Sequence, residues 1–508
     1  MSLIAKNSLL LTVAKFFSIA IYAVFGMVLA RQVDTTENGV YSLMATFLFF
    51  GGMISSFGIP LVITREVARA KELTAKYYAD GILAVIVGSF IATVVLGCYL
   101  FFEQYMREQF VEWHFVLFAI TMTVVFADAI GSVCDALFQA HERMAKPAVV
   151  EILTGLLRAG LAVIAIYTLP QHLRVLGVLV GFCIGSLLRA CIMRSLMEKN
   201  LLNGEVVSAK LRDAFSLIKS SGFIAVFRML RMLRNRLDIL LIGVLFVSMV
   251  EGVAADADVA RAIYAQAVRV AIIFHTITIA FNTALFPRMA QQTGDSKDVS
   301  AVRETYSRAV RWQGFWAIPL AAVVFLYADN ISNFFGADYL NGSPENGVLG
   351  TTGQMLQVLL IAVLFDCIGG PIGFVMLGYK DTERKAPMIG GVIATSSLAL
   401  NLLLIPVYGI LGAAMASAIT AFVEFMIKVV VVAKHLGSPW PIFVRLLPYV
   451  GITAVSGGAI FVAGLEDYAI WGALLAGTIY ILLCAVLKQL DPVVVKVGGE
   501  RLSLFKSN

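Results

Sequence analysis

The stretch FRMLRMLRNRLDILLIG, residues 227–243, decides how this chain must fold. It lies between apolar runs in a chain that is 59% hydrophobic, yet it carries Arg228, Arg231, Arg234, Arg236 and Asp238. An arginine that faces lipid at the centre of a spanning helix costs roughly 2.5–3.5 kcal/mol on insertion scales. Four such arginines would cost on the order of 10–14 kcal/mol, comparable to the whole stability of a typical domain. This segment must therefore turn its charges away from lipid.

The composition indicates an integral membrane protein. The mean hydropathy is +0.87 and 14% of the residues are charged, whereas soluble globular domains have about 25% charged residues. The net charge is +6, but no soluble segment is long enough to form a basic face for nucleic acid. We therefore expect no nucleic-acid partner. No GxxxxGK[ST] motif is present and no cofactor or metal is predicted, so transport would be secondary or driven by the membrane potential.

Apolar segments of about 20 residues, enough to cross the hydrocarbon core, recur along the whole chain. The prediction is an all-α polytopic membrane protein with fourteen spans, near 8–30, 39–63, 79–102, 113–138, 147–169, 174–197, 217–247, 261–287, 312–335, 351–378, 386–406, 409–434, 442–464 and 467–488.

The distribution of Lys and Arg between the loops sets the orientation. One alternating set of connections, which includes both termini, holds 24 of these residues, and the opposite set holds four: Arg31, Arg107, Arg174 and Arg261. Both termini are therefore predicted to be cytoplasmic. No outward loop is long enough for a catalytic domain, since the longest is GADYLNGSPENGVLG at 336–350. We therefore expect a protein that is not an enzyme.

A weak internal repeat predicts two lobes. The stretch from Tyr41 to Arg65 aligns without a gap with that from Tyr264 to Arg288, and the stretch after Asp128 resembles the one after Asp366. Parallel repeats of this kind are a transporter design with the substrate between the lobes. The predicted domains are residues 1–200 (spans 1–6), residues 201–436 (an amphipathic linker and spans 7–12) and residues 437–508 (spans 13–14 and a tail).

The opening stretch forms an amphipathic helix if it is helical throughout. At about 100° per residue, the leucines share one face and Arg236 stands apart, while the polar residues occupy the opposite arc: Arg228, Arg231, Arg234, Asn235 and Asp238. Three interpretations remain: pairing with acids or snorkelling to the surface, a voltage sensor, and the wall of an anion-binding cavity. The last fits best, because arginine forks grip phosphate oxygens bidentately.

Other ionisable residues also sit at membrane depth, which favours a hydrated interior. The first lobe contributes Lys15, Arg158 and Arg189, which together with Arg269 could complement the arginine arc around a substrate. Glu424, Asp366 and Asp128 could carry an exchanged proton or cation. For each of them, a satisfied interhelical ion pair is the alternative.

Several stretches resemble a known superfamily. LNLLLIPVYGILGAAMASAIT at 400–420 is a predicted hairpin that turns at Gly409, and it is similar to a hairpin of the multidrug/oligosaccharidyl-lipid/polysaccharide exporters. LARQVDTTENGVYSLMATF at 29–47 and GIPLVITREVA at 58–68 resemble the N-terminal signature of the polysaccharide branch, the flippases of lipid-linked oligosaccharides. ALFPRMAQ at 284–291 and AIYAQAVRV at 262–270 look like the two ends of the eighth span of that family.

The resemblance implies a V-shaped, alternating-access fold like that of the multidrug and toxin extrusion (MATE) transporters. It implies that an undecaprenyl-diphosphate-linked oligosaccharide crosses the cytoplasmic membrane, with its headgroup in a cationic central cavity, for synthesis of O-antigen, capsule or exopolysaccharide. Membrane lipids and a polysaccharide polymerase are the implied partners. The alternatives are a cation-coupled drug or metabolite exporter of the same fold and a lipid II flippase.

The predicted topology can be tested directly. Reporter fusions at Lys297 and Asn341 should report opposite sides of the membrane, cytoplasm and periplasm, because the loop charges place these positions on opposite sides. Labelling from the same side would contradict the fourteen-span topology.

Overall fold

The computed structural model of the chain describes residues 21, 24–108, 110–202, 211–234, 236–294, 299–379, 382, 385–438, 440–465 and 467–487. Within these ranges the chain is helical and contains no strand, with one isolated antiparallel bridge between Ser343 and Val348. The predicted all-α class is confirmed.

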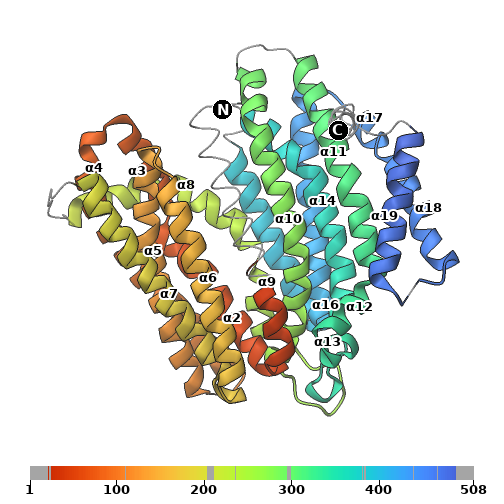
Figure 1. Cartoon of the computed structure of the whole chain (residues 1–508), viewed down its shortest axis with the longest axis horizontal. Helices are drawn as coiled ribbons and strands as arrows, with labels where there is room; N and C mark the ends of the chain where they lie inside the picture. Colours follow the sequence, from red (N-terminus) through yellow and green to blue (C-terminus); the bar gives the residue numbers. More distant parts are fainter. Residues whose placement is uncertain are drawn as a thin grey trace, which may run out of the picture. The chain divides into compact units, whose positions relative to one another are not determined.

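The helices follow one another with short connections (Figure 1). Residues 24–32 are helical. The long helices are α2 (Thr35–Ser56), α3 (Ile59–Arg69), α4 (Thr74–Met106), α5 (Glu112–Ala140), α6 (Ala145–Thr168), α7 (Arg174–Met197), α8 (Leu211–Leu233), α9 (Leu237–Leu245), α10 (Ala257–Gly294), α11 (Val299–Leu326), α14 (Thr352–Gly378), α16 (Ala386–Leu436), α18 (Leu447–Val462) and α19 (Ala469–Val486). The short elements are η1 (Lys71–Leu73), η2 (Gln171–Leu173), η3 (Glu198–Leu202), α12 (Ala328–Phe335), α13 (Ala337–Asn341), η4 (Pro344–Asn346) and α17 (Trp440–Val444).

The described helices match the predicted spans closely. Eleven of them are long and apolar enough to cross a membrane, and one of these, Pro387–Leu436, contains two predicted spans. Two of the fourteen predicted spans have no counterpart among these eleven segments. The first span, 8–30, lies mostly outside the described residues, and the seventh, 217–247, is not one helix.

The seventh span is divided into α8 and α9. The prediction of a single helix is wrong, because α8 ends at Leu233 and Arg236 caps α9 with a non-helical φ of −143°. A break of this kind frees backbone N–H and C=O groups, which hydrocarbon cannot satisfy. The break must therefore be covered by protein or water. The described part of the predicted amphipathic linker, from Leu211 onward, is continuous with α8.

The two members of the internal repeat differ in their backbones. The first is broken where Phe57 and Gly58 adopt φ values of 38° and 72°, so that α2 ends and α3 begins with Pro60 in its first turn. The second lies entirely within α10, which is continuous from Ala257 to Gly294. Proline in a first helical turn loses no hydrogen bond, so the Gly58–Pro60 sequence suits a restart.

The predicted hairpin at 400–420 is present in α16. Gly409 has φ 59° and ψ −137°, which separates two helical legs. Three residues later, a Cβ on Gly412 would lie 2.1 Å from the carbonyl oxygen of Leu404. In a straight helix, residues eight apart are separated by about 12 Å along the axis, so the chain reverses here. The prediction that Gly409 makes the turn is confirmed.

The chain forms two compact units, which are described separately below. Unit 1 comprises Met1–Arg269, Asn341–Gly350 and Gly390–Ala413, and unit 2 comprises Val270–Leu340, Thr351–Ile389 and Ala414–Asn508. The boundaries of the three predicted domains, at 200 and 436, stay predictions.

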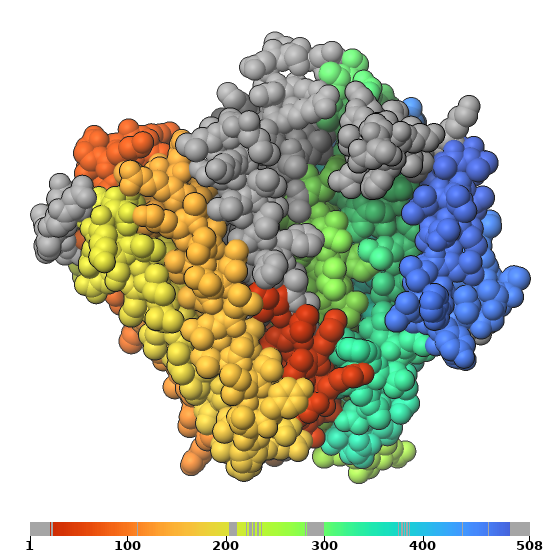
Figure 2. Space-filling model, viewed as in Figure 1, coloured from red at the N-terminus to blue at the C-terminus, as the bar shows by residue number. Residues whose placement is uncertain are grey.

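Two hydrophobic clusters lie among the described residues of unit 1. One joins α2, α4, α5, α6 and α7 and includes Leu43, Phe47, Val124 and Phe182. The other joins α3, α4, α5 and α7 and includes Ile63, Val133 and Met193. α6 and α7 are neighbours along their lengths, as Figure 2 shows on one face of the molecule. In unit 2, α11 packs against α14 and α18, and α18 packs against α19.

The hairpin yields a stability prediction. Gly412→Ala should lower the free energy of unfolding by roughly 1–3 kcal/mol, because the added methyl group meets backbone that cannot move aside. Gly458→Ala in α18 is the matched control: its Cβ would meet nothing within 4 Å, and alanine is favoured over glycine in helices by about 1 kcal/mol. Thermal unfolding of the two purified variants in detergent checks this. Equal melting temperatures would contradict the tight turn.

Candidate functional site

The arginine-rich stretch is only partly described. Arg228 and Arg231 lie on α8, and their side chains are outside the described part of the structure, as are all of Asn235 and Lys15. Arg234 follows the end of α8 and is half-buried. The arc predicted from Arg228 to Asp238 assumed one continuous helix, so the placement of Asp238 on that arc is wrong, and Asn235 lies outside the described residues.

The residues after the break are held by neighbouring helices of unit 1. The guanidinium of Arg236 lies 5.7 Å from the ring centre of Phe49 on α2. Asp238 is buried, accepts a hydrogen bond from the Tyr264 hydroxyl on α10, and caps its own helix through the Ile239 N–H at 2.9 Å. Asp238 therefore anchors α9 to α10.

Arg269 on α10 reaches across to α2. Its Nη atoms lie 2.9 Å from Gln266 Oε1 and 3.4 Å from both Asn38 Oδ1 and Ser42 Oγ. Its guanidinium also lies 5.6 Å from the centre of the Tyr41 ring. These four partners are neutral. The predicted role of Arg269 in substrate binding is compatible with this position, and it stays a prediction.

A charged cluster of five side chains joins α5, α6 and α7. Arg158 donates to both carboxylate oxygens of Asp128, at 2.6 and 3.4 Å. Arg189 lies 2.8 Å from Glu151 and 4.0 Å from Asp128, and it donates to Asp135. The five side chains carry three negative and two positive formal charges. We call them the α5–α7 cluster.

The exposure of the α5–α7 cluster shows which groups face accessible space. The two arginine side chains are 11–12% exposed, whereas the Asp128, Asp135 and Glu151 side chains are 36–41% exposed. Hydrocarbon cannot solvate an ionised carboxylate. Asp128 and Glu151 therefore require a hydrated space on their open side, whereas Oδ1 of Asp135 is buried.

Two glycines make room for the arginines of this cluster. A Cβ on Gly131 of α5 would lie 2.5 Å from Nη1 of Arg189, and a Cβ on Gly185 of α7 would lie 2.3 Å from Cγ of Arg158. Each arginine thus crosses a neighbouring helix at a position without a side chain. Close packing at small residues is how membrane helices approach one another.

Arg158 and Arg189 were predicted to add positive charge to a substrate cavity. The structure brings them together with the predicted coupling residue Asp128, and with Asp135 and Glu151, in ion pairs. The α5–α7 cluster has a formal charge of −1 and not a positive one. Arg158, Arg189 and Asp128 therefore form interhelical ion pairs, which was the alternative interpretation of these residues in the sequence.

The other two predicted coupling residues lie in unit 2. Asp366 on α14 approaches His275 on α10, with 3.6 Å between Oδ2 and Nε2. Glu424 on α16 forms an ion pair with Lys428 one turn later, at 2.6 Å. A Cβ on Gly373, two turns after Asp366, would lie 3.9 Å from Nζ of Lys428, so this face of α14 looks toward α16. All four side chains are half-buried or nearly buried.

Within the described ranges, no group of His, Cys, Asp or Glu could hold a metal ion.

Unit 1 contains a second charged network, which was not predicted from the sequence. Glu103 on α4 and Arg107, directly after the end of α4, meet Asp258 and Arg261 on α10, and Arg261 is completely buried. Arg107 and Arg261 were counted as outward loop charges. The signal that could have found the network is the spacing Glu-x-x-x-Arg and Asp-x-x-Arg, which puts both members of each pair on one helix face.

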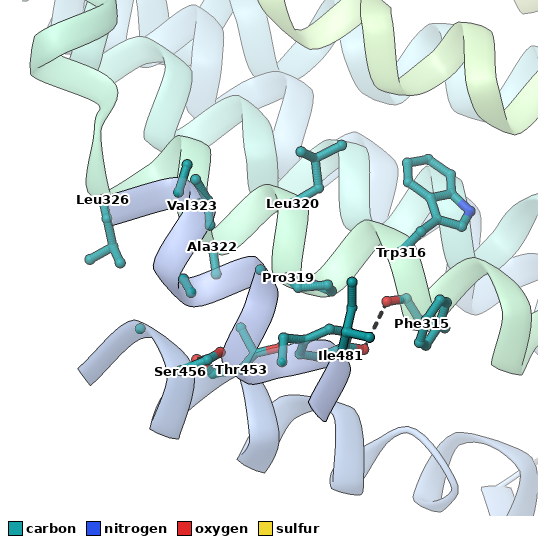
Figure 3. A pocket seen from close by; sticks show the side chains of 15 residues that line it. Phe315, Trp316, Pro319, Leu320, Ala322, Val323, Leu326, Thr453, Ser456 and Ile481 are labelled. Carbon is teal, nitrogen blue, oxygen red and sulfur yellow. Dashed lines mark hydrogen bonds between the residues drawn. The ribbon is translucent and has the colours of Figure 1, made fainter. Parts of the chain in front are cut away.

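Unit 2 contains an apolar cavity of about 300 Å³ between α11, α18 and α19. Figure 3 shows Phe315, Pro319, Val323, Thr453 and Ser456 around it, with the Tyr480 hydroxyl donating to the Phe315 carbonyl at 2.8 Å. The lining offers no charged group. Hydrocarbon fits this cavity, and nothing in the lining would distinguish one lipid chain from another.

Comparisons with known proteins identify families and relatives that are similar to this chain. Residues 4–293 match a family model described as polysaccharide biosynthesis protein, and residues 237–407 match the MatE family. A probable flippase AglR from Haloferax volcanii is 22% identical over 469 residues, covering 91% of this chain and 89% of that protein.

Solved structures share the fold. A structure of the lipid II flippase MurJ in an inward closed conformation matches with a TM-score of 0.73 and 14% identity, over 94% of this chain and 98% of that one. An inward-facing multidrug resistance MATE transporter matches with a TM-score of 0.57 and 14% identity, over 84% and 94% of the two chains. These relatives are transporters and not enzymes, in agreement with the sequence prediction. Because the polysaccharide biosynthesis model covers more than half of the sequence, the chain belongs to that family, within the superfamily that also contains the MATE transporters.

Proposed function

We propose that the protein is a flippase that moves a lipid-linked oligosaccharide across the cytoplasmic membrane by alternating access. The substrate class is an undecaprenyl-diphosphate-linked repeat unit destined for O-antigen, capsule or exopolysaccharide. Family membership and relatives described as flippases support this proposal. Both termini face the cytoplasm in this proposal, and a polysaccharide polymerase receives the product.

The observation that carries the proposal is the α5–α7 cluster. Asp128, Arg158 and Arg189 lie near the midpoints of helices that are long enough to span the membrane. The half-exposed carboxylates beside them require water or polar groups at that depth. A hydrated passage through the bilayer centre is what a large, polar sugar headgroup needs in order to cross.

The arginines of α8 are the proposed ligands of the diphosphate. Arg228 and Arg231, assisted by Arg234, would bind the diphosphate or an acidic sugar through bidentate contacts. Arg269 is the proposed additional contact, and Asn235 and Lys15 remain candidates. Arg158 and Arg189 already have carboxylate partners. We therefore propose that they stabilise the charged groups that line the hydrated passage.

One observation favours a second candidate, a cation-coupled exporter of drugs or metabolites. The α5–α7 cluster is net negative and would attract a cationic substrate. Reconstituted vesicles separate the two candidates and also test the third, a lipid II flippase. Flipping of a lipid-linked oligosaccharide, of lipid II and of a cationic dye is measured in parallel, and the proposal requires that the oligosaccharide moves fastest.

The arginine assignment predicts graded losses. Arg228→Ala and Arg231→Ala should each weaken substrate binding about 10- to 150-fold, because a charge-assisted hydrogen bond contributes roughly 1.5–3 kcal/mol. Lysine at these positions should rescue only part of the loss, because it keeps the charge and lacks the fork. Flipping is measured in vesicles at matched protein amounts.

Arg236 serves as the control in this series, because it stacks on Phe49 beyond the end of α8. Arg236→Lys should bind substrate within about threefold of the wild type, since a lysine keeps a cation over the ring. The assignment fails if Arg228→Ala and Arg231→Ala transport normally while Arg236→Lys does not.

Asp366 and Glu424 are the proposed carriers of an exchanged proton or cation, with Asp128 as a further candidate. Asp366→Asn and Glu424→Gln should abolish the dependence of flipping on a pH or ion gradient while substrate binding persists, because an amide cannot take up the ion. Asp467→Asn, in the exposed connection between α18 and α19, is the matched control. Gradient dependence that survives in both membrane variants would remove these residues from the mechanism.

A further inference from the structure

The buried four-charge network of Glu103, Arg107, Asp258 and Arg261 is unusual in how its charges are arranged. Two contacts cross from α4 to α10: Arg107 lies 2.8 Å from Asp258, and Arg261 lies 2.5 Å from Glu103. Two further contacts stay on one helix: Arg107 lies 3.0 Å from Glu103, and Arg261 lies 3.0 Å from Asp258. The four charges thus form a closed square.

The square divides into two neutral halves. Separating α4 from α10 breaks both crossing pairs, yet each arginine keeps the acid of its own helix, one turn away. Breaking an ordinary buried pair is strongly unfavourable because it leaves an unpaired charge. Here no charge is left unpaired on either side. The arrangement therefore suits a contact that must open and close repeatedly.

Hydrogen bonds next to the four-charge network also join α4 to the helices on the side of α10. Arg107 Nε donates to the Gly243 carbonyl of α9 at 2.9 Å, and the Tyr99 hydroxyl of α4 donates to the Leu240 carbonyl of α9 at 2.6 Å. A Cβ on Gly243 would lie 1.6 Å from Nη2 of Arg261. α9 and α10 therefore form one side, and the polar face of α4 forms the other.

α2 packs against the N-terminal end of α10, where the four-charge network lies. A Cβ on Gly39 of α2 would lie 1.8 Å from the carbonyl oxygen of Asp258, so the two backbones touch. Nearby, the hydroxyl of Thr36 lies 3.5 Å from the carboxylate of Asp256, just before α10. The predicted topology places Arg107 and Arg261 on the outward side of the membrane. This end of unit 1 is thus shut on the outward side.

We propose that the four-charge network is a reversible outward gate, in which α2 and α4 part from α9 and α10 while each half stays neutral. This inference rests on the proposed alternating-access transport. It assigns to Glu103, Arg107, Asp258 and Arg261 a role in setting the balance between closed and open states, separate from substrate contact.

The opening itself is tested by a disulfide. In a background that lacks the six native cysteines, Thr36→Cys with Asp256→Cys should cross-link readily in the closed state. Oxidation should abolish flipping, and a reductant should restore it. Undiminished flipping by the cross-linked protein would overturn the gate.

Two charge swaps of identical composition test the square. Glu103→Arg with Arg107→Glu keeps the pairs within each helix and makes both crossing contacts repulsive, so the gate should open and cross-linking should slow at least about tenfold. Glu103→Arg with Arg261→Glu keeps the crossing pairs and leaves like charges on each half. This second variant should cross-link as fast as the parent double-cysteine protein. It should flip slowly, because in its open state one side carries two positive charges and the other side carries two negative charges. Reversing all four charges should restore both rates.

A milder variant covers the case in which the swaps fail to fold. Tyr99→Phe removes one hydrogen bond that crosses the gate, and it should slow cross-linking about two- to tenfold. Equal effects of the two swaps on cross-linking, or an unchanged rate in Tyr99→Phe, would show a static structural network. Cross-linking needs no substrate, so a protein that gates as predicted and flips no lipid-linked oligosaccharide would refute the proposed function alone.

Discussion

The absence of water from the hydrocarbon core is the constraint on which the rest of the structure depends. A charge at that depth needs a partner of opposite sign, a dipole or a hydrated space. In the described part of unit 1, Arg158, Arg189 and Arg261 each meet carboxylates. Arg269 meets amide, hydroxyl and aromatic groups. The helices are arranged so that each of these arginines meets its partners.

Glycine is the residue that makes such coincidences possible. A guanidinium is bulky, and it can lie between two helices only where one of them lacks a side chain. Gly131, Gly185 and Gly243 each face an arginine at a distance that any Cβ would close. The same property brings α2 against α10 at Gly39. Arginine and glycine thus act as complementary pairs, in which one fills the space that the other provides.

The two charged groups of unit 1 differ in a way that fits two different roles. The α5–α7 cluster has a formal charge of −1 and its acidic side chains are 36–41% exposed, so its excess charge requires solvation by water or by polar groups. The four-charge network is neutral and buried, and each helix in it is neutral by itself. The first arrangement fits the proposed polar passage, whereas the second can be separated without leaving an unpaired charge. Neither arrangement is net positive, so the proposed source of a positive cavity is the arginines of α8 together with Arg269.

The sequence by itself determined the class, most of the spans and the turn at Gly409, because hydropathy and the backbone freedom of glycine are local properties of the chain. It also identified Arg158, Arg189, Asp128, Asp366 and Glu424 as residues at membrane depth. It did not determine their partners, since Arg158 and Asp128 are thirty residues apart and lie on different helices. The break between Leu233 and Leu237 was missed because a helical period was extended through it. Arg107 and Arg261 looked like loop charges, and only the tertiary structure, by bringing α4 against α10, decided that they are paired with carboxylates and that Arg261 is buried. Pairing depends on which helix faces meet, and that is a property of the packed molecule that no single segment carries.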